Sequence, residues 1–474
     1  MPDVTSQPKT RTERDSQGTL EVPADAYYGV QTARAIQNFP ISGERLHIEM
    51  VRAVARIKVA AARANMEVGA LDRKKGDAIV QAAEEVLAGK HDKDFVVDAY
   101  QAGAGTSFHM NVNEVIANRA CELLGGKRGD PALVSPNDHV NMAQSTNDVI
   151  PTAMRMASHV LIGPVLEEMK ALARSLGGRA QAFARVLKSG RTHLQDAVPI
   201  TLGQEFSGYE VSVQGWVDSL ARSRDGLLAL GLGGNAVGTG INAHPEYRTR
   251  AVKHLAQLTG MPFVPARNLF EAMQSMAPFV RVSSDLRGFA LDLNRIANDL
   301  RLLASGPTTG LYEILLPAVQ PGSSIMPGKV NPVMLEMTNM VCYQVIGYDT
   351  TVAFASQAGQ LELNVMMPVI AHDLTKALAI LAPALRALRE KCIDGITANE
   401  EVCRRYFERS TALATALNPY IGYLAAAEVA KESVKTGKTV VELVREKKLL
   451  TEEQIKKVFS PEGMTNPGGE ETRS

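Results

Sequence analysis

Residues 282–303 read VSSDLRGFALDLNRIANDLRLL, and the spacing of their apolar side chains decides the fold class. An α-helix completes a turn about every 3.6 residues, so positions alternately four and three residues apart lie on one face. The positions with this spacing are Val282, Leu286, Phe289, Leu293, Ile296, Leu300 and Leu303. The stretch therefore predicts a long helix with one apolar seam that must be buried against other helices.

Three further segments repeat this spacing. Their apolar positions are Leu202, Phe206, Tyr209, Val213, Trp216 and Leu220; Ile370, Leu374, Ala377, Leu381, Ala384 and Leu388; and Val165, Met169, Leu172 and Leu176. Long helices with such seams pack nearly parallel to one another, which predicts a mainly α protein built on a helix bundle. Because one chain need not cover every seam, the bundle also favours an oligomer.

The rest of the chain is expected to form smaller helical parts. Residues 45–69 and 74–88 read as helices after an irregular segment, and shorter helices are expected near 399–408 and 420–436. A polar tail from Ser460 is expected to be poorly ordered. This pattern predicts three domains: a mixed, mostly helical N-terminal domain, a central helix bundle, and a small C-terminal helical domain with the tail. Their expected ranges are 1–143, 144–398 and 399–474.

Composition excludes several classes of partner. Acidic and basic residues balance at 51 each, so the charge gives no footprint of binding to nucleic acid or to an anionic membrane. The N-terminus is polar, and no later stretch is expected to be long and apolar enough to span a bilayer. Four cysteines without pairing or metal-ligand spacing fit buried, reduced thiols. The sequence thus predicts a soluble cytoplasmic protein with no nucleic-acid or membrane partner.

The most informative polar stretch is residues 322–332, GSSIMPGKVNP. Glycines and prolines set a shaped loop there, and hydroxyls, a lysine and an asparagine crowd into it. Asn331 followed by Pro332 reads as an N-cap with proline in the first helical turn. Since a helix N-terminus carries partial positive charge, this loop is expected to bind a carboxylate.

Three other stretches concentrate hydroxyls, amides and glycine at expected junctions between elements. They are residues 103–107, which His109 and Asn111 follow, residues 144–148, and residues 190–196. Each one alone is better explained by helix capping or a turn, and a lone histidine such as His193 is usually structural. Four such stretches sharing one chemistry favour a site, and His193 follows a glycine in a setting that presents it.

No motif asks for a cofactor. Residues 231–240, GLGGNAVGTG, are rich in glycine, but the strand before them and the helix opening on them that a dinucleotide fold requires are not expected. No zinc-protease motif, His/Cys cluster or P-loop is present. We therefore expect neither a nucleotide nor a required metal.

The loop at 322–332 resembles the signature loop of the aspartase/fumarase superfamily, and the resemblance extends from Ala24 to Pro467. Residues 103–107 and 145–147 resemble the form found in aspartate ammonia-lyases, whereas residues 112–115 and 240–247 lean toward class II fumarases. Met367 stands where aspartases usually carry glutamate and fumarases lysine. The resemblance implies a three-domain fold whose central bundle forms the core of a homotetramer, with each site shared between three subunits.

The resemblance also implies a reaction. A proton beside a carboxylate of a small dicarboxylate is removed, and the charge that develops on that carboxylate needs donors already aimed at it. Ser323 would be the base, provided that loop amides, Lys329 and a helix terminus stabilise its alkoxide. Ser323 and His193 are the expected catalytic residues, and Glu336 would hold His193. The expected substrate-binding residues are Thr106, Ser145, Thr146 and Ser324 at the β-carboxylate, Thr192, Lys329 and Asn331 at the α-carboxylate, and Asn147 and His193 near the amino group.

Several functions stay open at this point. The leading interpretation is deamination of L-aspartate to fumarate, and the nearest rival is hydration of fumarate to L-malate. A lyase for a larger N-substituted substrate such as argininosuccinate fits the aspartase-type stretches less well, and a structural protein reusing the fold would not need the intact loop. Whether a divalent cation activates the enzyme is left open, because no ligand set is recognisable.

Overall fold

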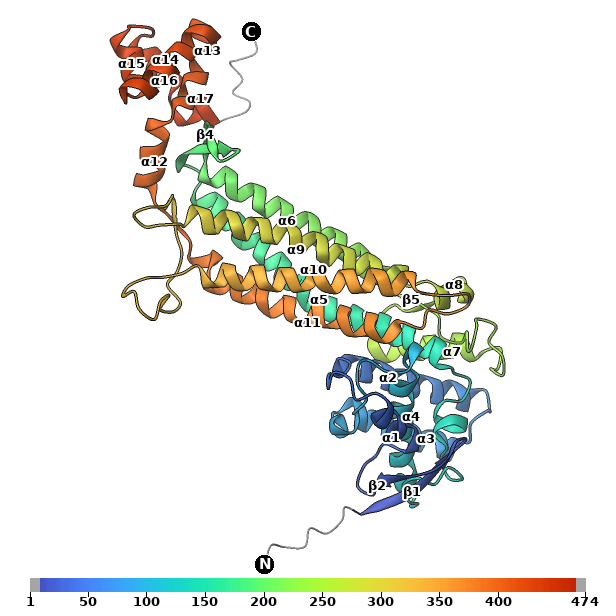
Figure 1. The fold of residues 1–474 in the computed structure, drawn as a ribbon. Helices are drawn as coiled ribbons and strands as arrows, with labels where there is room; N and C mark the ends of the chain where they lie inside the picture. The colour runs from blue at the N-terminus through green and yellow to red at the C-terminus, as the bar shows by residue number, and fades with distance from the viewer. Residues whose placement is uncertain (1–8, 466–474) are drawn as a thin grey trace, which may run out of the picture. The chain divides into compact units, whose positions relative to one another are not determined.

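The structure, a computed structural model, describes residues 9–465, and the protein is mainly α (Figure 1). Residues 1–8 and 466–474 lie outside the described part. Contacts divide the chain into two compact units. The first comprises Met1–Leu166, Asp218–Gly288 and Tyr343–Ala382, and the second Glu167–Val217, Phe289–Cys342 and Pro383–Ser474. The expected three-domain division stays a prediction.

Five helices of at least 24 residues lie within residues 9–465. They are α5 (Thr146–Ala182), α6 (Leu202–Asp225), α9 (Ala277–Leu303), α10 (Val333–Gln357) and α11 (Met367–Lys391). The four seams predicted from spacing fall on α5, α6, α9 and α11, and the seam of α9 is buried along its whole length. Burying these seams is what holds long helices together. The prediction of a helix bundle is confirmed.

Polar pairs between the long helices occur in both units. In the first unit, Ser283 of α9 donates to Asp349 Oδ1 of α10 at 2.7 Å. In the second, Trp216 Nε1 of α6 donates to Asp292 Oδ2 of α9 at 2.7 Å, and Arg386 Nε of α11 donates to Glu168 Oε1 of α5 at 2.7 Å. These bonds fix which helix faces which neighbour.

The first unit also contains an N-terminal hairpin and several shorter helices. Strands β1 (Thr10–Asp15) and β2 (Gly18–Pro23) pair antiparallel, and α1 (Val30–Asn38) follows. The prediction of an irregular segment here was wrong, because β1 is a two-faced polar strand without an apolar alternation to reveal it. The predicted helices at 45–69 and 74–88 are confirmed. Its further α-helices and strands are α2 (Ile48–Glu67), α3 (Arg73–Leu87), α4 (Thr106–Leu123), β5 (Ala229–Leu230), α7 (Tyr247–Thr259), β6 (Val264–Pro265) and α8 (Leu269–Gln274).

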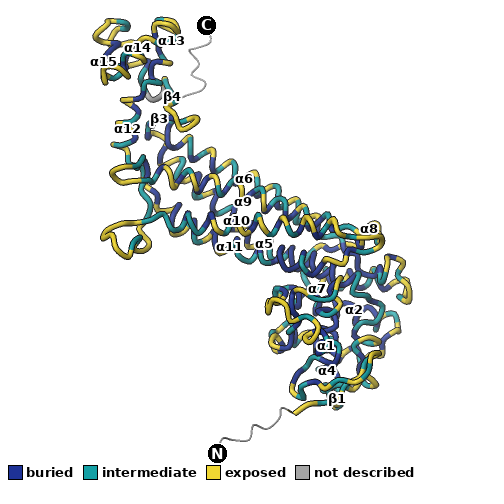
Figure 2. Tube along the Cα trace, viewed as in Figure 1, coloured by how far each residue is buried: buried dark blue, intermediate teal, exposed yellow. Residues whose placement is uncertain are grey.

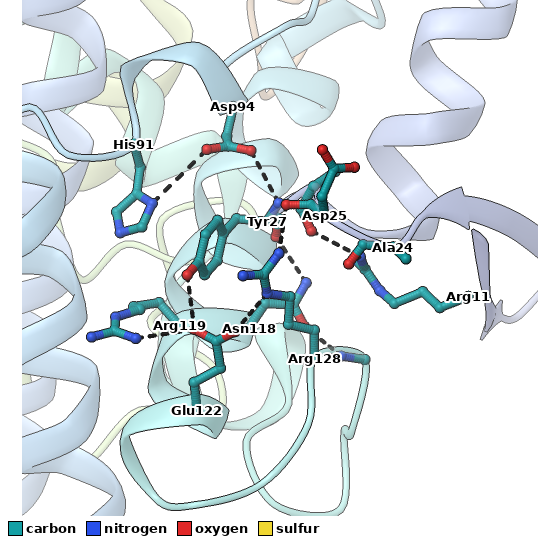
Figure 3. A network of polar contacts seen from close by, with 12 residues as sticks. Arg11, Ala24, Asp25, Tyr27, His91, Asp94, Asn118, Arg119, Glu122 and Arg128 are labelled. Atoms are coloured by element: carbon teal, nitrogen blue, oxygen red, sulfur yellow. Dashed lines mark hydrogen bonds and ion pairs between the residues drawn. The ribbon is translucent and has the colours of Figure 1, made fainter. Parts of the chain in front are cut away.

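Tyr27 fastens the segment between the hairpin and α1 to the rest of this unit (Figure 3). Its hydroxyl donates to Glu122 Oε2 at 2.8 Å, and the Arg128 guanidinium lies 3.7 Å from the centre of its ring. Its backbone is held at both ends, since its N–H donates to Asp94 and its carbonyl accepts from Asn118. The charges of Glu122 and Arg128 therefore both act on one aromatic side chain.

The second unit carries a hairpin and the C-terminal helices. Strands β3 (Leu187–Thr192) and β4 (Gln195–Thr201) pair antiparallel, and β7 (Ile314–Leu315) pairs with β8 (Thr397–Ala398). The helices predicted near 399–408 and 420–436 are confirmed as α12 (Glu400–Arg409) and α14 (Tyr423–Thr436). The further helices are α13 (Asn418–Ile421), α15 (Val440–Glu446), α16 (Glu452–Val458) and α17 (Pro461–Thr465). The prediction of a poorly ordered tail from Ser460 was wrong as far as Thr465, because α17 occupies that segment. The remainder of the predicted tail, residues 466–474, lies outside the described residues.

Two segments contradict the expectation that no part of the chain is long and apolar enough to span a bilayer. Helix α5 and the segment Met367–Gly395 are long and apolar enough to cross a bilayer by length and composition alone. In their most apolar windows, 78% and 61% of the residues are buried inside the protein. The expectation was wrong on composition, and burial marks both segments as core helices. The four cysteines are free and buried, as predicted.

Candidate active site

The predicted polar stretches lie at element junctions, two of them at neighbouring helix N-termini in the first unit. Thr106 is the first residue of α4 and Thr146 the first residue of α5. Nδ1 of His109, one turn into α4, lies 2.8 Å from Thr146 Oγ1. The two helix ends are therefore joined, and the partial positive charge of a helix N-terminus favours an anion nearby.

Ser145 caps α5. Its Oγ accepts from the backbone N–H of Asn147 at 3.2 Å, and its own N–H donates to Asp148 Oδ1 at 2.9 Å. This reciprocal pair is the structural role that capping residues were expected to offer. Because the Ser145 oxygen accepts in this pair, the proton of its hydroxyl is still able to donate. Asn147 Nδ2 donates to Ala236 O at 2.8 Å.

The glycine-rich stretch at residues 231–240 donates backbone hydrogen bonds to Asp148. The side chain is fully buried, and its Oδ2 accepts from the backbone N–H groups of Gly233 at 3.0 Å and Asn235 at 2.9 Å. Burial raises the pKa of Asp148 to about 6, although the backbone hydrogen bonds and Lys58 act against the rise. The glycine-rich turn thus serves a carboxylate of the protein itself.

Lys58 is a residue that the sequence reading missed. It lies inside α2, is fully buried, and places Nζ 2.7 Å from His109 Nε2. Asn141 Oδ1 and Gln144 Oε1 accept from the same Nζ at 3.0 and 2.9 Å. Burial lowers the pKa of Lys58 well below its ordinary value, and the Asp148 carboxylate opposes that shift. Its signal in the sequence is only a lysine within an alanine-rich apolar helix.

In the second unit, Thr192 and His193 lie at the tip of the β3–β4 hairpin. His193 and Leu194 form its two-residue turn with φ of 56° and 58°. Both central residues in the left-handed region match a type I′ turn, in which glycine or asparagine is preferred. Thr192 and His193 are exposed. The expectation that His193 is presented is confirmed.

A buried charge cluster anchors this hairpin. Glu313 is fully buried, with Oε2 2.9 Å from Lys188 Nζ and Oε1 2.9 Å from Arg191 Nη1. Lys188 also contacts Glu205 Oε2 at 2.7 Å. Two cations and two carboxylates hold β3 to the start of α6 and to the segment that leads into the 322–332 loop. The hairpin is therefore fixed in direction even though its tip is exposed.

The 322–332 loop is closed at its neck. The Gly322 N–H donates to Lys329 O at 2.7 Å, and Asn331 Nδ2 donates to Gly322 O at 2.7 Å. A Cβ on residue 322 would lie 2.6 Å from Lys329 O, so only glycine fits. The prediction that a helix begins where the loop ends is confirmed by α10 at Val333. The predicted N-cap role of the Asn331 side chain was wrong, because its amide crosses the neck instead.

Ser323 lies within this loop with its oxygen turned to backbone donors. Its Oγ accepts from the N–H groups of Met326 at 2.9 Å and Ile325 at 3.2 Å. Ser323 and Lys329 both line a surface cavity of about 470 Å³. Ser324 and Lys329 are exposed, and most of the loop between α9 and α10 is drawn as exposed in Figure 2.

The structure thus gathers the predicted residues into two groups. Thr106 and residues 145–147 belong to the first unit, and the hairpin tip, the loop and Glu336 belong to the second. Among residues 9–465 no hydrogen bond joins Glu336 to His193, so that pairing stays a prediction. The same part of the chain contains no group of three or more His, Cys, Asp and Glu side chains that could hold a metal ion.

Comparison with known proteins places these features in context. A lyase family model matches residues 18–347, and a model of the fumarase C C-terminus matches residues 413–466. The chain is 49% identical over 465 residues to an aspartate ammonia-lyase of Bacillus subtilis (strain 168), covering 98% of each chain. It is 52% identical over 459 residues to a class II fumarate hydratase of Halobacterium salinarum, covering 97% of each.

Two solved structures share the fold. A fumarate lyase:delta crystallin from Brucella melitensis superposes with a TM-score of 0.93 at 47% identity, over 97% of this chain and 100% of that chain. A class II fumarase from Schistosoma mansoni gives a TM-score of 0.93 at 38% identity, with the same coverage. The expected mainly α superfamily fold is confirmed.

Proposed function

This chain belongs to the aspartase/fumarase superfamily of lyases, and we propose that within it the chain is a carbon–nitrogen lyase that converts L-aspartate reversibly to fumarate and ammonia. The observation that carries the proposal is the setting of Ser323, whose oxygen accepts from two loop amides. Relatives named aspartate ammonia-lyase match nearly the whole chain. The aspartase-type residues 103–107 and 145–147 favour this substrate over malate.

Ser323 acts as the base. A serine hydroxyl in water does not ionise near neutral pH, so it removes a proton only where its alkoxide is stabilised. The N–H groups of Ile325 and Met326 supply part of that stabilisation, and the Lys329 cation on the same loop supplies more. Closure of the exposed loop over substrate excludes water and strengthens both effects.

The proton leaves the carbon beside the β-carboxylate, which then carries a second negative charge in an aci-carboxylate. Donors that are already in place stabilise this intermediate more than the substrate, which is the condition for lowering the barrier. Hydroxyls at the N-termini of α4 and α5 suit this task. The residues proposed for the β-carboxylate are Thr106, Ser145, Thr146 and Ser324.

The remaining residues fix the α-carboxylate and the leaving group. Lys329 supplies a charge-assisted hydrogen bond to the α-carboxylate. Asn147 and His193 lie near the amino group, and Glu336 holds His193. The residues proposed for the α-carboxylate are Thr192, Lys329 and Asn331.

A homotetramer brings the polar regions of three subunits together at each site. This arrangement accounts for their separation in the sequence and for exposed apolar side chains along α10, where Met340, Tyr343 and Phe354 are 65%, 57% and 66% exposed. In this proposal the enzyme acts in the cytoplasm on a small dicarboxylate and has no nucleic-acid or membrane partner. It requires no cofactor, and activation by a divalent cation stays an open question.

The second candidate is class II fumarate hydratase, because residues 112–115 and 240–247 follow that pattern and the relative from Halobacterium salinarum is 52% identical. Incubating the purified protein with L-aspartate and, separately, with L-malate and following the ultraviolet absorbance of fumarate separates the two. Fumarate from aspartate supports the proposal. Fumarate from malate alone overturns it in favour of the hydratase.

A further inference from the structure

Lys58, His109 and Thr146 form a chain of contacts that runs from the interior of α2 to the first residue of α5. Lys58 and His109 are 0% and 1% exposed, whereas Thr146 is half-buried at the helix end. The two contacts are 2.7 Å from Lys58 Nζ to His109 Nε2 and 2.8 Å from His109 Nδ1 to Thr146 Oγ1. All three residues belong to the first unit. A buried lysine in line with a site hydroxyl calls for an account of where the protons lie.

The other two neighbours of Lys58 can only accept. Asn141 Nδ2 donates to Gln144 O at 3.3 Å, so its Oδ1 faces Lys58. Gln144 Nε2 donates to Val140 O at 3.2 Å and to Met142 O at 3.1 Å, so its Oε1 faces Lys58 as well. The amide orientations are fixed by the backbone carbonyls on their far sides.

An ammonium group has three donors and no acceptor. With two donors used by Asn141 and Gln144, the third goes to His109 Nε2, which must then be unprotonated. His109 itself stays neutral, because burial and the charge of Lys58 lower its pKa well below the ordinary value. A neutral imidazole that accepts at Nε2 carries its proton on Nδ1 and donates it to Thr146 Oγ1.

The direction of these hydrogen bonds decides what the Thr146 hydroxyl can do. Since its oxygen already accepts from His109, its own proton is directed elsewhere and is available to an incoming carboxylate. With a neutral Lys58 amine, the two hydrogen bonds would run in the opposite direction. Lys58 Nζ would accept from His109 Nε2–H, and the Thr146 hydroxyl would donate to His109 Nδ1. Burial lowers the pKa of Lys58 and so favours the neutral amine, whereas the Asp148 carboxylate opposes that shift. The two amide oxygens at 3.0 and 2.9 Å favour the ammonium form, because a charged donor makes stronger hydrogen bonds to them than a neutral amine does.

We propose that Lys58 and His109 are positioning residues that set the Thr146 hydroxyl as a hydrogen-bond donor to the substrate carboxylate. The proposal rests on the function proposed above, in which Thr146 binds the carboxylate that gains charge. Neither positioning residue touches the reacting atoms. They contribute by preventing the Thr146 hydroxyl from donating to His109, so that its proton stays directed toward the substrate.

A double-mutant cycle tests the proposal in the full-length enzyme. Thr146→Val removes the hydroxyl and is expected to lower kcat about 10²- to 10³-fold, as the loss of one preorganised donor does. His109→Phe removes the group that orients the hydroxyl and is expected to lower kcat about 10- to 100-fold, as the loss of a supporting partner does. If His109 acts through Thr146, the double variant is no slower than Thr146→Val alone. Fold-losses that multiply in the double variant overturn the proposal.

Two further variants serve as controls for the cycle. Thr146→Ser keeps a hydroxyl in the same place and retains kcat within a few-fold. His139 provides the matched control, because it also contacts a lysine, with Nε2 3.1 Å from Lys75 Nζ, and it lies in the same unit. His139→Phe leaves kcat unchanged, and an equal loss there would mean that histidine replacement in this unit acts through structure alone.

Neutron diffraction on the unsubstituted protein decides the proton positions without relying on activity or on a folded variant. Deuterium on His109 Nδ1 and three deuterons on Lys58 Nζ are expected. Deuterium on Nε2, or on both ring nitrogens, overturns the proposal. If the enzyme turns over neither aspartate nor malate, the proposed function fails, and the neutron map still decides the hydrogen-bond direction.

Discussion

The hydroxyl oxygen of Ser323 accepts a hydrogen bond from the backbone N–H of Met326 at 2.9 Å. The donor lies three residues further along the same loop, so the contact moves with the loop and does not depend on how it docks elsewhere. An oxygen that gains negative charge strengthens such a bond, because charge-assisted hydrogen bonds are about twice as strong as neutral ones. The proposed base and part of its stabilisation therefore belong to one segment.

Replacing this hydroxyl tests the assignment directly. Ser323→Ala is expected to lower kcat about 10²- to 10⁴-fold, since a positioned general base contributes that much, and to leave the fold and assembly intact. Steady-state kinetics with circular dichroism and light scattering provide the measurement. A variant that keeps near-normal kcat would remove Ser323 from the mechanism.

Lys329→Ala tests binding instead of proton transfer. Loss of a hydrogen bond from a charged donor to a carboxylate costs about 1.5–3 kcal/mol, so KM is expected to rise roughly 10- to 100-fold with a smaller change in kcat. Lys435→Ala, which alters an exposed lysine of α14, is the matched control and should leave KM unchanged. An unchanged KM for Lys329→Ala contradicts the carboxylate-binding role.

Lys188→Met tests the charge cluster that anchors the hairpin. The substitution leaves the fully buried Glu313 with one cation in place of two, and breaking a buried pair typically costs about 3–5 kcal/mol. The free energy of unfolding is expected to fall by an amount near that range. Lys431→Met breaks an ion pair whose partners are 73% and 72% exposed and is expected to cost below about 1 kcal/mol. Equal losses in the two variants would show that Glu313 does not depend on Lys188.

The lowered pKa of Glu85 leads us to expect that the free energy of unfolding depends on pH in the acid range. The hydrogen bond from Arg119 lowers the pKa of Glu85 from 4.5 to about 2. Because the folded pKa lies below the unfolded one, the stabilisation is fully present above about pH 4.5 and is lost as pH falls toward 2. Glu85→Gln is expected to lower stability by about 1–3 kcal/mol at neutral pH and by less at pH 3. Denaturant unfolding at both values measures this, and a pH-independent loss contradicts the assignment.

Periodic burial is what made the bundle visible in the sequence. The seams on α5, α6, α9 and α11 follow from one buried face per helix. Helix α10 also has a buried face, but polar residues such as Thr338 and Asp349 lie on it and apolar side chains such as Met340 and Phe354 occupy exposed positions, so its apolar residues form no regular seam. Strand β1 has no apolar residue at all. Elements whose faces do not differ in polarity leave no periodic trace.

The candidate site divides in the same way. Loop and cap residues such as Ser323, Thr106 and His193 are recognisable because glycine, proline and hydroxyls cluster around them. Lys58 is not, since its three partners lie 51, 83 and 86 residues away in sequence. The glycines near Gly233 likewise gain meaning only from Asp148. Contacts between distant segments depend on packing, which spacing along the chain does not encode.

The closed neck of the 322–332 loop has a consequence for proteolysis. Ile325, at the loop tip, is 84% exposed, and exposed tips are preferred cleavage sites. A protease that cuts there would part Ser323 from Lys329 along the chain, yet the bonds from Gly322 to Lys329 and Asn331 would still join the two new ends. The nicked protein would then be two polypeptides held together by the packing and polar pairs of the long helices, with Ser323 and Lys329 kept near one another by the two hydrogen bonds at the base of the severed loop.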